Sequence, residues 1–187
     1  MIRPVAFRMN EQTAVNNYYQ KVIDGLLPAT VNAKAQAEFD AYVEKLRAVG
    51  INVIVIDDTV EPDTPDSVFP NNWISFHENG DIALYPMFAE NRRLERREDI
   101  FDILEEKGFQ INDIMDYTSA EEDEIFLEGT GSIILDRENE MAYCALSPRA
   151  GEELFIEFCE DFEYNPVIFE AYQTVNGERK HIYHTNV

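Results

Sequence analysis

The sequence predicts an α/β fold built from similar strand-strand-helix-strand modules. Short runs of β-branched residues alternate with stretches in which apolar side chains recur every three or four positions, which is typical of alternating strands and helices. Gly50 and Gly108, each at the expected end of a helix, are 58 residues apart, and Arg92 and Arg149 are 57 apart. A period this regular indicates modules that stack on one another or surround an axis.

Each predicted module closes with a helix and a strand. These pairs are expected at 33–49 with 51–56, at 91–107 with 109–115, and at 149–162 with 167–169. In the first two pairs a glycine follows the helix, which suits the left-handed conformation that commonly ends a helix. The first module is the least regular, as terminal repeats often are.

A hairpin precedes the second and the third helix. The hairpins are expected at 73–77 with 82–85 and at 133–136 with 141–146. Asn79-Gly80 in the first hairpin favours a tight primed turn. Residues 181–187 fall where a further module would begin, so we expect the start of a strand there.

The composition narrows the class of protein. A chain of 187 residues with a 45% hydrophobic fraction can bury a substantial core, so we treat 1–187 as one domain. No apolar run approaches the ~20 residues of a membrane span, and we expect no signal peptide and no membrane partner. Two cysteines make no disulfide framework, which predicts a cytoplasmic location.

The formal net charge of −22 also limits the partners. A surface this acidic repels phosphate backbones, so we expect no nucleic-acid partner. The charge could attract a cationic substrate, or it could simply keep the surface well solvated. We expect the acidic run 121–124 to be a solvated loop, and we expect no metal and no cofactor.

Three polar residues repeat with the modules. Asn72 precedes the first hairpin, Glu128 precedes the second, and His184 holds the matching place in the third. Each is 56 residues from the next. If the modules surround an axis, a carboxamide, a carboxylate and an imidazole converge and form a candidate site, although polar residues at strand starts can also coincide by chance.

Three segments together resemble the guanidino-group-modifying superfamily, the penteins, which includes arginine deiminases, dimethylarginine hydrolases and amidinotransferases. The segments are Asp66-Ser-Val-Phe-Pro-Asn-Asn-Trp73, Leu127-Glu-Gly-Thr-Gly-Ser132 and His184-Thr-Asn-Val187. The chain looks most like the citrulline-utilisation hydrolases, often labelled amidinotransferase-like, from Arg3 to its last residue. This resemblance implies a five-bladed α/β propeller, of which residues 1–187 would form about three modules of a C-terminally incomplete catalytic domain.

The resemblance also implies how the site works. A cysteine thiolate would attack the central carbon of a ureido or guanidino group, with His184 as the acid and base. Glu128 would hold the imidazole or bind the substrate nitrogens, and Asp66 would bind substrate. The partner implied is a small amino acid.

Two arginines at expected helix starts resemble the family's carboxylate-binding residues. Arg93, or its neighbour Arg92, would bind the substrate α-carboxylate together with Arg149. A guanidinium pairs well with a carboxylate, and a helix N-terminus adds favourable potential. The alternative is that these arginines pair with the many acidic residues of the surface.

The chain departs from the arginine deiminases at two positions. Asn72 and Asn186 stand where those enzymes carry aspartate. Asparagine brings no charge but can donate to a carbonyl oxygen, which suits a neutral ureido group better than a guanidinium. The sequence therefore favours citrulline as substrate, with arginine as the alternative.

Neither cysteine suits the role of nucleophile. Cys144 falls in an expected strand and Cys159 in an expected helix, where both resemble small core residues. The nucleophile would then lie outside this chain, and the chain alone would be inactive. Two alternatives remain: an amidinotransferase, whose first half-reaction is identical, and a non-catalytic fragment that associates with itself or with a missing C-terminal part.

Overall fold

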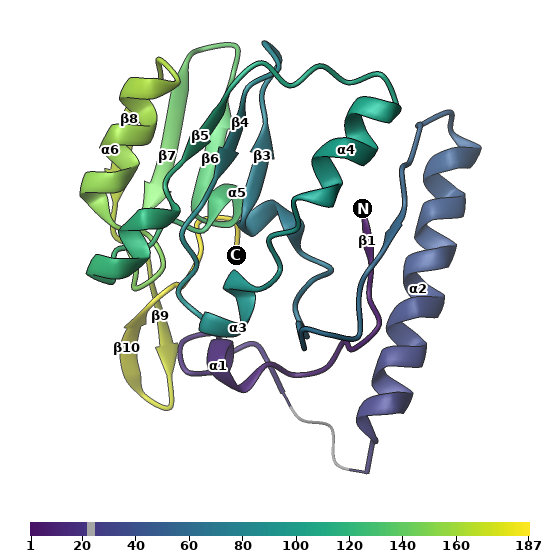
Figure 1. Ribbon diagram of the computed structural model, residues 1–187. Coiled ribbons are helices and arrows are strands. Elements are labelled where there is room, and N and C mark those ends of the chain that lie inside the picture. Colours follow the sequence, from purple (N-terminus) through teal and green to yellow (C-terminus); the bar gives the residue numbers. More distant parts are fainter. Residues whose placement is uncertain (22–24) are drawn as a thin grey trace. The chain divides into compact units, whose positions relative to one another are not determined.

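A computed structural model describes residues 1–21 and 25–187 and confirms the α/β class. The chain separates into two compact units, 1–70 and 71–187. Each unit is treated by itself below. Several small sheets, none with more than three strands within the described ranges, make up the β-structure (Figure 1).

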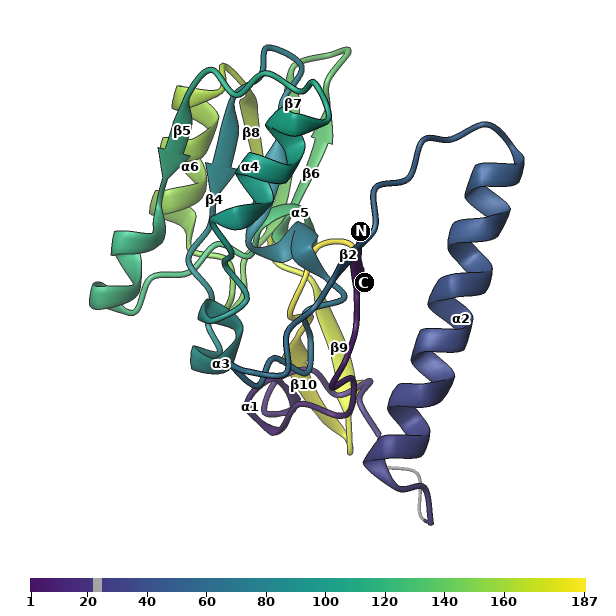
Figure 2. The ribbon, with the colours of Figure 1, turned by 45° about the vertical axis from the view of Figure 1, so that its right-hand side comes forward.

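The first unit is built around one long helix. Strand β1 (Ile2–Arg3) pairs in parallel with β2 (Ile56–Asp57), and helices α1 (Glu11–Ala14) and α2 (Pro28–Ala48) lie between them in sequence. Figure 2 shows α2 as one continuous helix. The expected helix 33–49 is confirmed, and it begins earlier, at a proline that suits a first helical turn.

The strands expected at 51–56 and 109–115 are both wrong for most of their length, since β2 begins at Ile56 and β5 (Ile114–Asp116) begins at Ile114. Among the described residues of the first stretch, Ile56 and Asp57 pair with β1, opposite Ile2 and Arg3. Gly50 does take the expected left-handed conformation, with φ of 85°.

The second unit holds two modules with the same strand order. The strands of these two modules are β3 (Ile74–Phe76), β4 (Ile82–Leu84), β5 (Ile114–Asp116), β6 (Ile133–Asp136), β7 (Met141–Ala145) and β8 (Asn165–Phe169). In each module the first two strands form an antiparallel hairpin, and the third runs parallel to the second. The helix α6 (Glu152–Asp161) precedes β8 as expected and lies alongside β7 and β8 in Figure 1. The strand-strand-helix-strand prediction is confirmed for both modules.

The helix expected at 91–107 is broken in two. The structure has α3 (Glu90–Arg93) and α4 (Asp99–Glu106), separated by residues 94–98. The side chains in and beside the break bind partners that a straight helix would not face: Arg96 pairs with Glu121, and Arg97 pairs with Asp99. Leu94, expected on the apolar face, is consequently exposed.

The strand expected from residue 181 is also wrong. β9 (Tyr172–Val175) and β10 (Glu178–His181) form a hairpin, and the strand ends at His181 where a start was expected. Residues 182–187 then follow an irregular path. Gly177 and Asn176 supply the positive φ values of this turn, a signal that the periodicity argument overlooks.

Two smaller expectations need correction. The turn of the first hairpin spans three residues rather than two, with His77 N donating to Asp81 O and Gly80 at φ of 90°. The acidic run is not a loop, because most of it belongs to the 3-10 helix η2 (Thr118–Asp123). Glu121 of this helix binds Arg96 through both carboxylate oxygens.

The core of the second unit lies between α6 and the two sheets. Phe155 and Phe158 of α6 are fully buried, and the ring of Phe158 contacts several aromatic rings of the unit. Cys144 and Cys159 belong to this core and are free thiols, which confirms their expected burial. Burying such side chains contributes about 1.5–3 kcal/mol each, so this cluster holds both modules in place.

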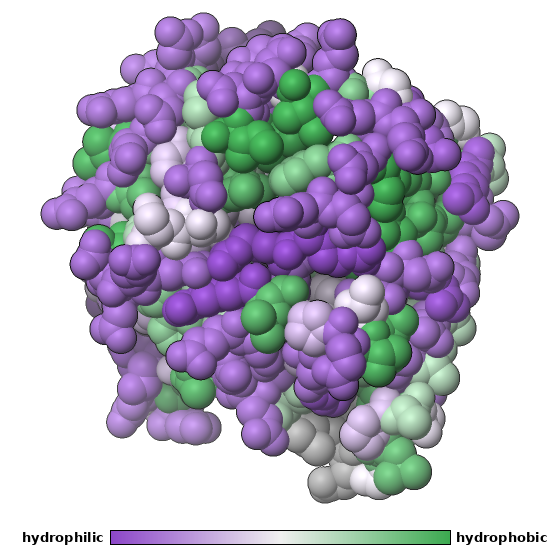
Figure 3. All heavy atoms as spheres, viewed as in Figure 1, coloured by the Kyte–Doolittle hydropathy of each residue, from purple (hydrophilic) through white to green (hydrophobic). Residues whose placement is uncertain are grey.

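The surface of the protein is largely hydrophilic on the face that Figure 3 shows. On the face drawn in Figure 3, hydrophilic residues predominate and hydrophobic residues form separate patches. In the ranges that the structure covers, none of the helices combines the length and the apolar character needed to cross a membrane.

His77 makes the stability of the second unit sensitive to acid. Its ring stacks on Phe162 with 3.9 Å between centroids, and burial, helped by the charge of Arg137 against that of Asp81, lowers the pKa of His77 to about 4. Below pH 6.5 the unfolded chain takes up a proton that the folded chain refuses until about pH 4, so the unfolding free energy falls as pH falls through this window.

We therefore expect His77→Phe, which keeps the stack, to lose part of this acid sensitivity. The measurement is the melting temperature at pH 7.5 and at pH 5.0 for both proteins, and the wild type should show the larger drop. Equal drops would show that His77 is not responsible.

Candidate active site

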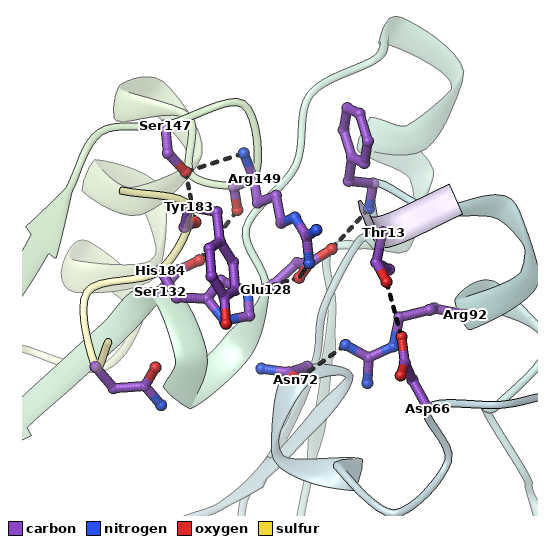
Figure 4. Close-up of polar contacts among 12 residues, drawn as sticks. Thr13, Asp66, Asn72, Arg92, Glu128, Ser132, Ser147, Arg149, Tyr183 and His184 are labelled. Atoms are coloured by element: carbon purple, nitrogen blue, oxygen red, sulfur yellow. Dashed lines mark hydrogen bonds and ion pairs between the residues drawn. The ribbon is translucent and has the colours of Figure 1, made fainter. Parts of the chain in front are cut away.

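Asn72, Glu128 and His184 come together in the second unit. Asn72 ends the 3-10 turn η1 (Pro70–Asn72) before β3, and Glu128 directly precedes the short helix α5 (Gly129–Ser132) before β6. His184 follows β10, and its Nε2 lies 2.6 Å from Glu128 Oε2. Figure 4 draws the three side chains in one close-up, and all three are buried. The equal spacing in sequence thus corresponds to proximity in the structure.

Gly131 lies between the histidine and the asparagine. A Cβ at this position would be 2.7 Å from His184 Nδ1 and closer still to Asn72 Nδ2. The two polar side chains therefore approach the same point of α5 from different modules. A glycine is needed here for space, since its backbone conformation is ordinary.

The segment that carries His184 is fastened to α5 by hydrogen bonds. The hydroxyl of Thr185 donates to Ser132 O at 2.5 Å and accepts from Ala145 N at 2.8 Å. The hydroxyl of Ser147 donates to Tyr183 O at 2.8 Å. These contacts fix the backbone on both sides of the histidine, which fixes the direction of its ring.

Glu128 is an ionised carboxylate at the centre of the group. Complete burial tends to raise the pKa of Glu128, but the hydrogen bond with His184 and the charge of Arg149 outweigh it and lower the pKa to about 2. Arg149 Nη1 lies 3.3 Å from Oε2, and the backbone N–H of Phe88 donates to Oε1 at 3.1 Å. The carboxylate is thus held on both oxygens.

His184 is neutral and has a defined tautomer. Burial lowers the pKa of His184, and the opposing effect of Glu128 does not overcome it. Since Glu128 can only accept, Nε2 carries the proton and donates it to the carboxylate. Nδ1, beside Gly131, is left with a lone pair and can take up a proton. This arrangement is that of a general base oriented by a carboxylate.

Arg149 is buried with the group. Its guanidinium lies 4.8 Å from the ring centroid of Tyr183 and 5.8 Å from that of Phe88, in addition to its contact with Glu128. A positive charge between two aromatic faces is stabilised by both rings. Arg149 therefore belongs to the site, as the sequence predicts, although its role there stays a prediction.

Arg92, and not Arg93, reaches Asn72. Arg92 Nη1 donates to Asn72 Oδ1 at 2.9 Å, and its guanidinium is buried. Arg93 instead donates to Met87 O at 3.0 Å and lies 3.6 Å from Glu121. Arg93 lines a separate pocket of about 420 Å³ together with Asp116, Thr118, Ser119, Glu121 and Glu122.

The two remaining predicted residues have other surroundings. Asn186 is exposed, and its Nδ2 donates to Thr130 O at 3.2 Å. Asp66 belongs to the first unit, where its Oδ2 accepts from Asn10 Nδ2 at 2.9 Å and from the hydroxyl of Thr13 at 3.1 Å. Their proposed contacts with substrate stay predictions.

Sequence patterns did not single out Glu95, which binds Arg92 through two hydrogen bonds of 2.9 Å. The i,i+3 spacing of the two residues on a helical turn is the signal that could have found this pair. The same spacing occurs at many places in a chain with 37 acidic residues, so the signal is weak. The sequence analysis did not identify Gly131, because no sequence pattern indicates that the side chains of Asn72 and His184 lie against it.

The chain matches a protein-family profile over nearly its whole length. The profile described as N,N dimethylarginine dimethylhydrolase, eukaryotic, matches residues 3–187. A search among curated proteins finds no match.

Solved structures share the fold. The N-terminal domain of ArgZ, an arginine dihydrolase from the ornithine-ammonia cycle in Cyanobacteria, is 17% identical with a TM-score of 0.64, over 97% of this chain and 59% of that one. A dimethylarginine dimethylaminohydrolase adduct is 18% identical with a TM-score of 0.58, over 81% of this chain and 55% of that one. A mutant of the enzyme from Pseudomonas aeruginosa, complexed with citrulline, is 19% identical with a TM-score of 0.53, over 78% and 53%. This chain spans less than two thirds of the length of each of these structures.

Proposed function

This chain belongs to the N,N-dimethylarginine dimethylhydrolase family, within the guanidino-group-modifying superfamily, and from that premise we propose a function for its second unit. The protein is proposed to be a hydrolase that acts on the ureido or guanidino group of an amino acid. The second unit would supply His184 as its general acid and base, Glu128 to orient the imidazole, and Arg149 to bind the substrate carboxylate. The observation that carries the proposal is the buried pair of His184 and Glu128, 2.6 Å apart.

The proposed chemistry needs one thiol and one imidazole. His184 Nδ1 takes the proton of the thiol, and the thiolate forms a bond to the central carbon of the substrate. The protonated imidazole then gives its proton to the departing nitrogen as the carbon–nitrogen bond breaks. In the second step Nδ1 takes a proton from water, the oxygen bonds to the same carbon, and the thiol leaves with its proton restored.

The thiol of this reaction is proposed to come from outside the 187 residues. Burial raises the pKa of Cys144 to about 12 and that of Cys159 to about 11, so neither forms a thiolate readily. Both also lie in the hydrophobic core. Free thiols in the core agree with a reducing compartment, and we propose a cytoplasmic location.

We expect the thiols of Cys144 and Cys159 to be unreactive in the folded protein. Ellman's reagent should label neither until denaturant is added, because the reagent attacks thiolates that solvent can reach. Replacing both by alanine should leave turnover intact in the protein expressed from its complete gene. Loss of turnover with an unchanged melting temperature would assign the nucleophile to one of them.

The polar group of the second unit favours a neutral substrate. Arg92 and Arg149 carry two positive charges, and Glu95 and Glu128 carry two negative charges. Because His184 is neutral, these charges cancel. A ureido group adds no charge to these five side chains, whereas a guanidinium would add a positive charge beside Arg92 and Arg149. Citrulline is therefore the favoured substrate.

The α-carboxylate of the substrate is assigned to Arg149 with a second arginine. Arg93, or its neighbour Arg92, is proposed as this second arginine; in Arg92 the donors Nε, Nη1 and Nη2 already bind Glu95 and Asn72. Asp66 and Asn186 are proposed to bind the remaining polar groups of the amino acid.

The test compares three substrates. The protein expressed from its complete gene is incubated with citrulline, arginine or N,N-dimethylarginine, and product formation is followed by amino-acid analysis. We expect turnover that is fastest with citrulline. Faster turnover of arginine would contradict the proposed substrate, and no turnover of any of the three would contradict the proposed function.

A further inference from the structure

We propose that Glu95 is a positioning residue that fixes the direction of the Asn72 carboxamide through Arg92, and thereby favours a ureido oxygen over a guanidinium N–H at the site. The inference rests on the proposed function, and its test includes a measurement that needs no turnover. It identifies a specificity-determining residue that touches no substrate.

The first link is the pair of Glu95 and Arg92. Glu95 follows α3, and its backbone N–H donates to Arg92 O at 3.1 Å, which continues the helical turn. The two carboxylate oxygens accept from Arg92 Nε and Nη2, both at 2.9 Å. The side chains are 1% and 3% exposed respectively. A two-point contact between buried planar groups allows the guanidinium a single orientation.

The second link runs from Arg92 to Asn72. With Nε and Nη2 turned toward Glu95, Nη1 remains on the other side of the guanidinium, and it donates to Asn72 Oδ1 at 2.9 Å (Figure 4). A guanidinium offers only donors, so the atom of Asn72 that faces it must be the oxygen. The donor groups of Arg92 therefore fix which end of the Asn72 carboxamide faces them.

The third link is the amide nitrogen of Asn72. With Oδ1 held by Arg92, His184 Nδ1 lies 2.7 Å from the point where a Cβ of Gly131 would be, and Nδ2 of Asn72 lies closer still to the same point. The group beside the proposed base is therefore a donor. A donor can bind the carbonyl oxygen of a ureido group, but it faces only other donors in a guanidinium.

Without the charge of Glu95, Arg92 loses the two charge-assisted hydrogen bonds that orient its guanidinium. Arg92 could turn away from Asn72, and the carboxamide could rotate so that Oδ1 faces His184. An acceptor in that place would bind the N–H groups of a guanidinium. The ratio between the two substrates should therefore shift even though Glu95 lies behind Arg92.

The experiment uses Glu95→Gln with Glu121→Gln as the matched control. Glu121 also binds an arginine, Arg96, through both oxygens, but it has no link to Asn72. For the protein expressed from its complete gene, we measure kcat/KM for citrulline and for arginine. In Glu95→Gln the ratio of citrulline to arginine should fall by about tenfold, the usual worth of one well-placed hydrogen bond, and in Glu121→Gln it should stay at the wild-type value.

An equal fall for both substrates in Glu95→Gln would overturn the proposal, because it would show a merely structural role. If Glu95→Gln does not fold, Glu95→Asp replaces it, since the charge is kept while the two-point geometry is weakened, and a smaller shift of the ratio is expected.

A measurement without turnover separates this inference from the proposed function. Nitrogen-15 NMR spectra should show the side-chain signals of Asn72 Nδ2 and Arg92 Nε shifted in Glu95→Gln and unchanged in Glu121→Gln. Unchanged signals in Glu95→Gln would overturn the link from Glu95 to Asn72. A wild type that turns over neither substrate would overturn only the proposed function.

Discussion

Replacing His184 by glutamine is expected to lower kcat by about 10²–10⁴-fold, the usual contribution of a general acid and base. Glutamine keeps a side-chain N–H that can donate to Glu128, so the carboxylate stays paired with both His184's replacement and Arg149. The melting temperature should therefore change little while the chemical step fails. Turnover of the protein expressed from its complete gene, with its best substrate, is the measurement.

The control for this substitution is His181→Gln. His181 ends β10 and packs against Tyr172 with 4.5 Å between ring centroids, three residues from the proposed base. Its loss should leave kcat within the error of the assay. A similar loss of kcat in both variants would point to disturbance of the C-terminal segment as a whole, and an active His184→Gln protein would remove the histidine from the mechanism.

The second large effect is expected at Gly131. In Gly131→Ala the new methyl group meets His184 and Asn72 from two directions, so both must move. A displacement of about 1 Å in a reacting group can cost about 10²-fold in rate, and we expect a loss of at least this size in kcat. The ultraviolet circular dichroism spectrum should stay that of the wild type, because the shift is confined to two side chains.

Gly151→Ala is the matched control for the steric argument. A Cβ there would meet the end of the Ile125 side chain at 3.2 Å, which can move aside by a few tenths of an ångström. Turnover close to the wild-type value is expected for Gly151→Ala. If Gly131→Ala is equally active, the close approach of Asn72 and His184 to α5 has no catalytic importance.

The sequence predicted the parts of this fold that depend on local pattern. Two hairpins, the order of strands and helices in the second unit, and the left-handed positions at Gly50 and Gly108 follow from periodicity and glycine placement. The third helix instead leads to Glu163 with a φ of 59°, a position where the first two modules have glycine. Glutamate does not favour a positive φ, so the residue type gave no reason to predict this conformation at Glu163.

The parts that escaped prediction depend on contacts between segments distant in sequence. The break between α3 and α4 reflects the pairing of Arg96 with Glu121, 25 residues away. The choice of Arg92 over Arg93 depends on which guanidinium faces Asn72, 20 residues away. Periodicity predicts which residues share a face of a helix, but it does not predict which charged residue from another segment will pair with them.

The repeat did predict the convergence of Asn72, Glu128 and His184, because equal spacing in a modular fold places residues at equivalent points. It could not predict that Glu128 would be ionised and His184 neutral. That result depends on burial and on the charge of Arg149, which are properties of the folded unit.

The two hairpin turns of the second unit have a consequence for how this chain can vary in length. Asn72 and Glu128 precede β3 and β6, whereas the turns 77–81 and 137–140 follow those strands at their other ends. Insertions in either turn would lengthen a hairpin away from the polar group. An insertion between residues 128 and 132 would instead rotate Glu128 relative to His184. Among relatives of this chain, changes in length should therefore collect at the turns and be absent from α5.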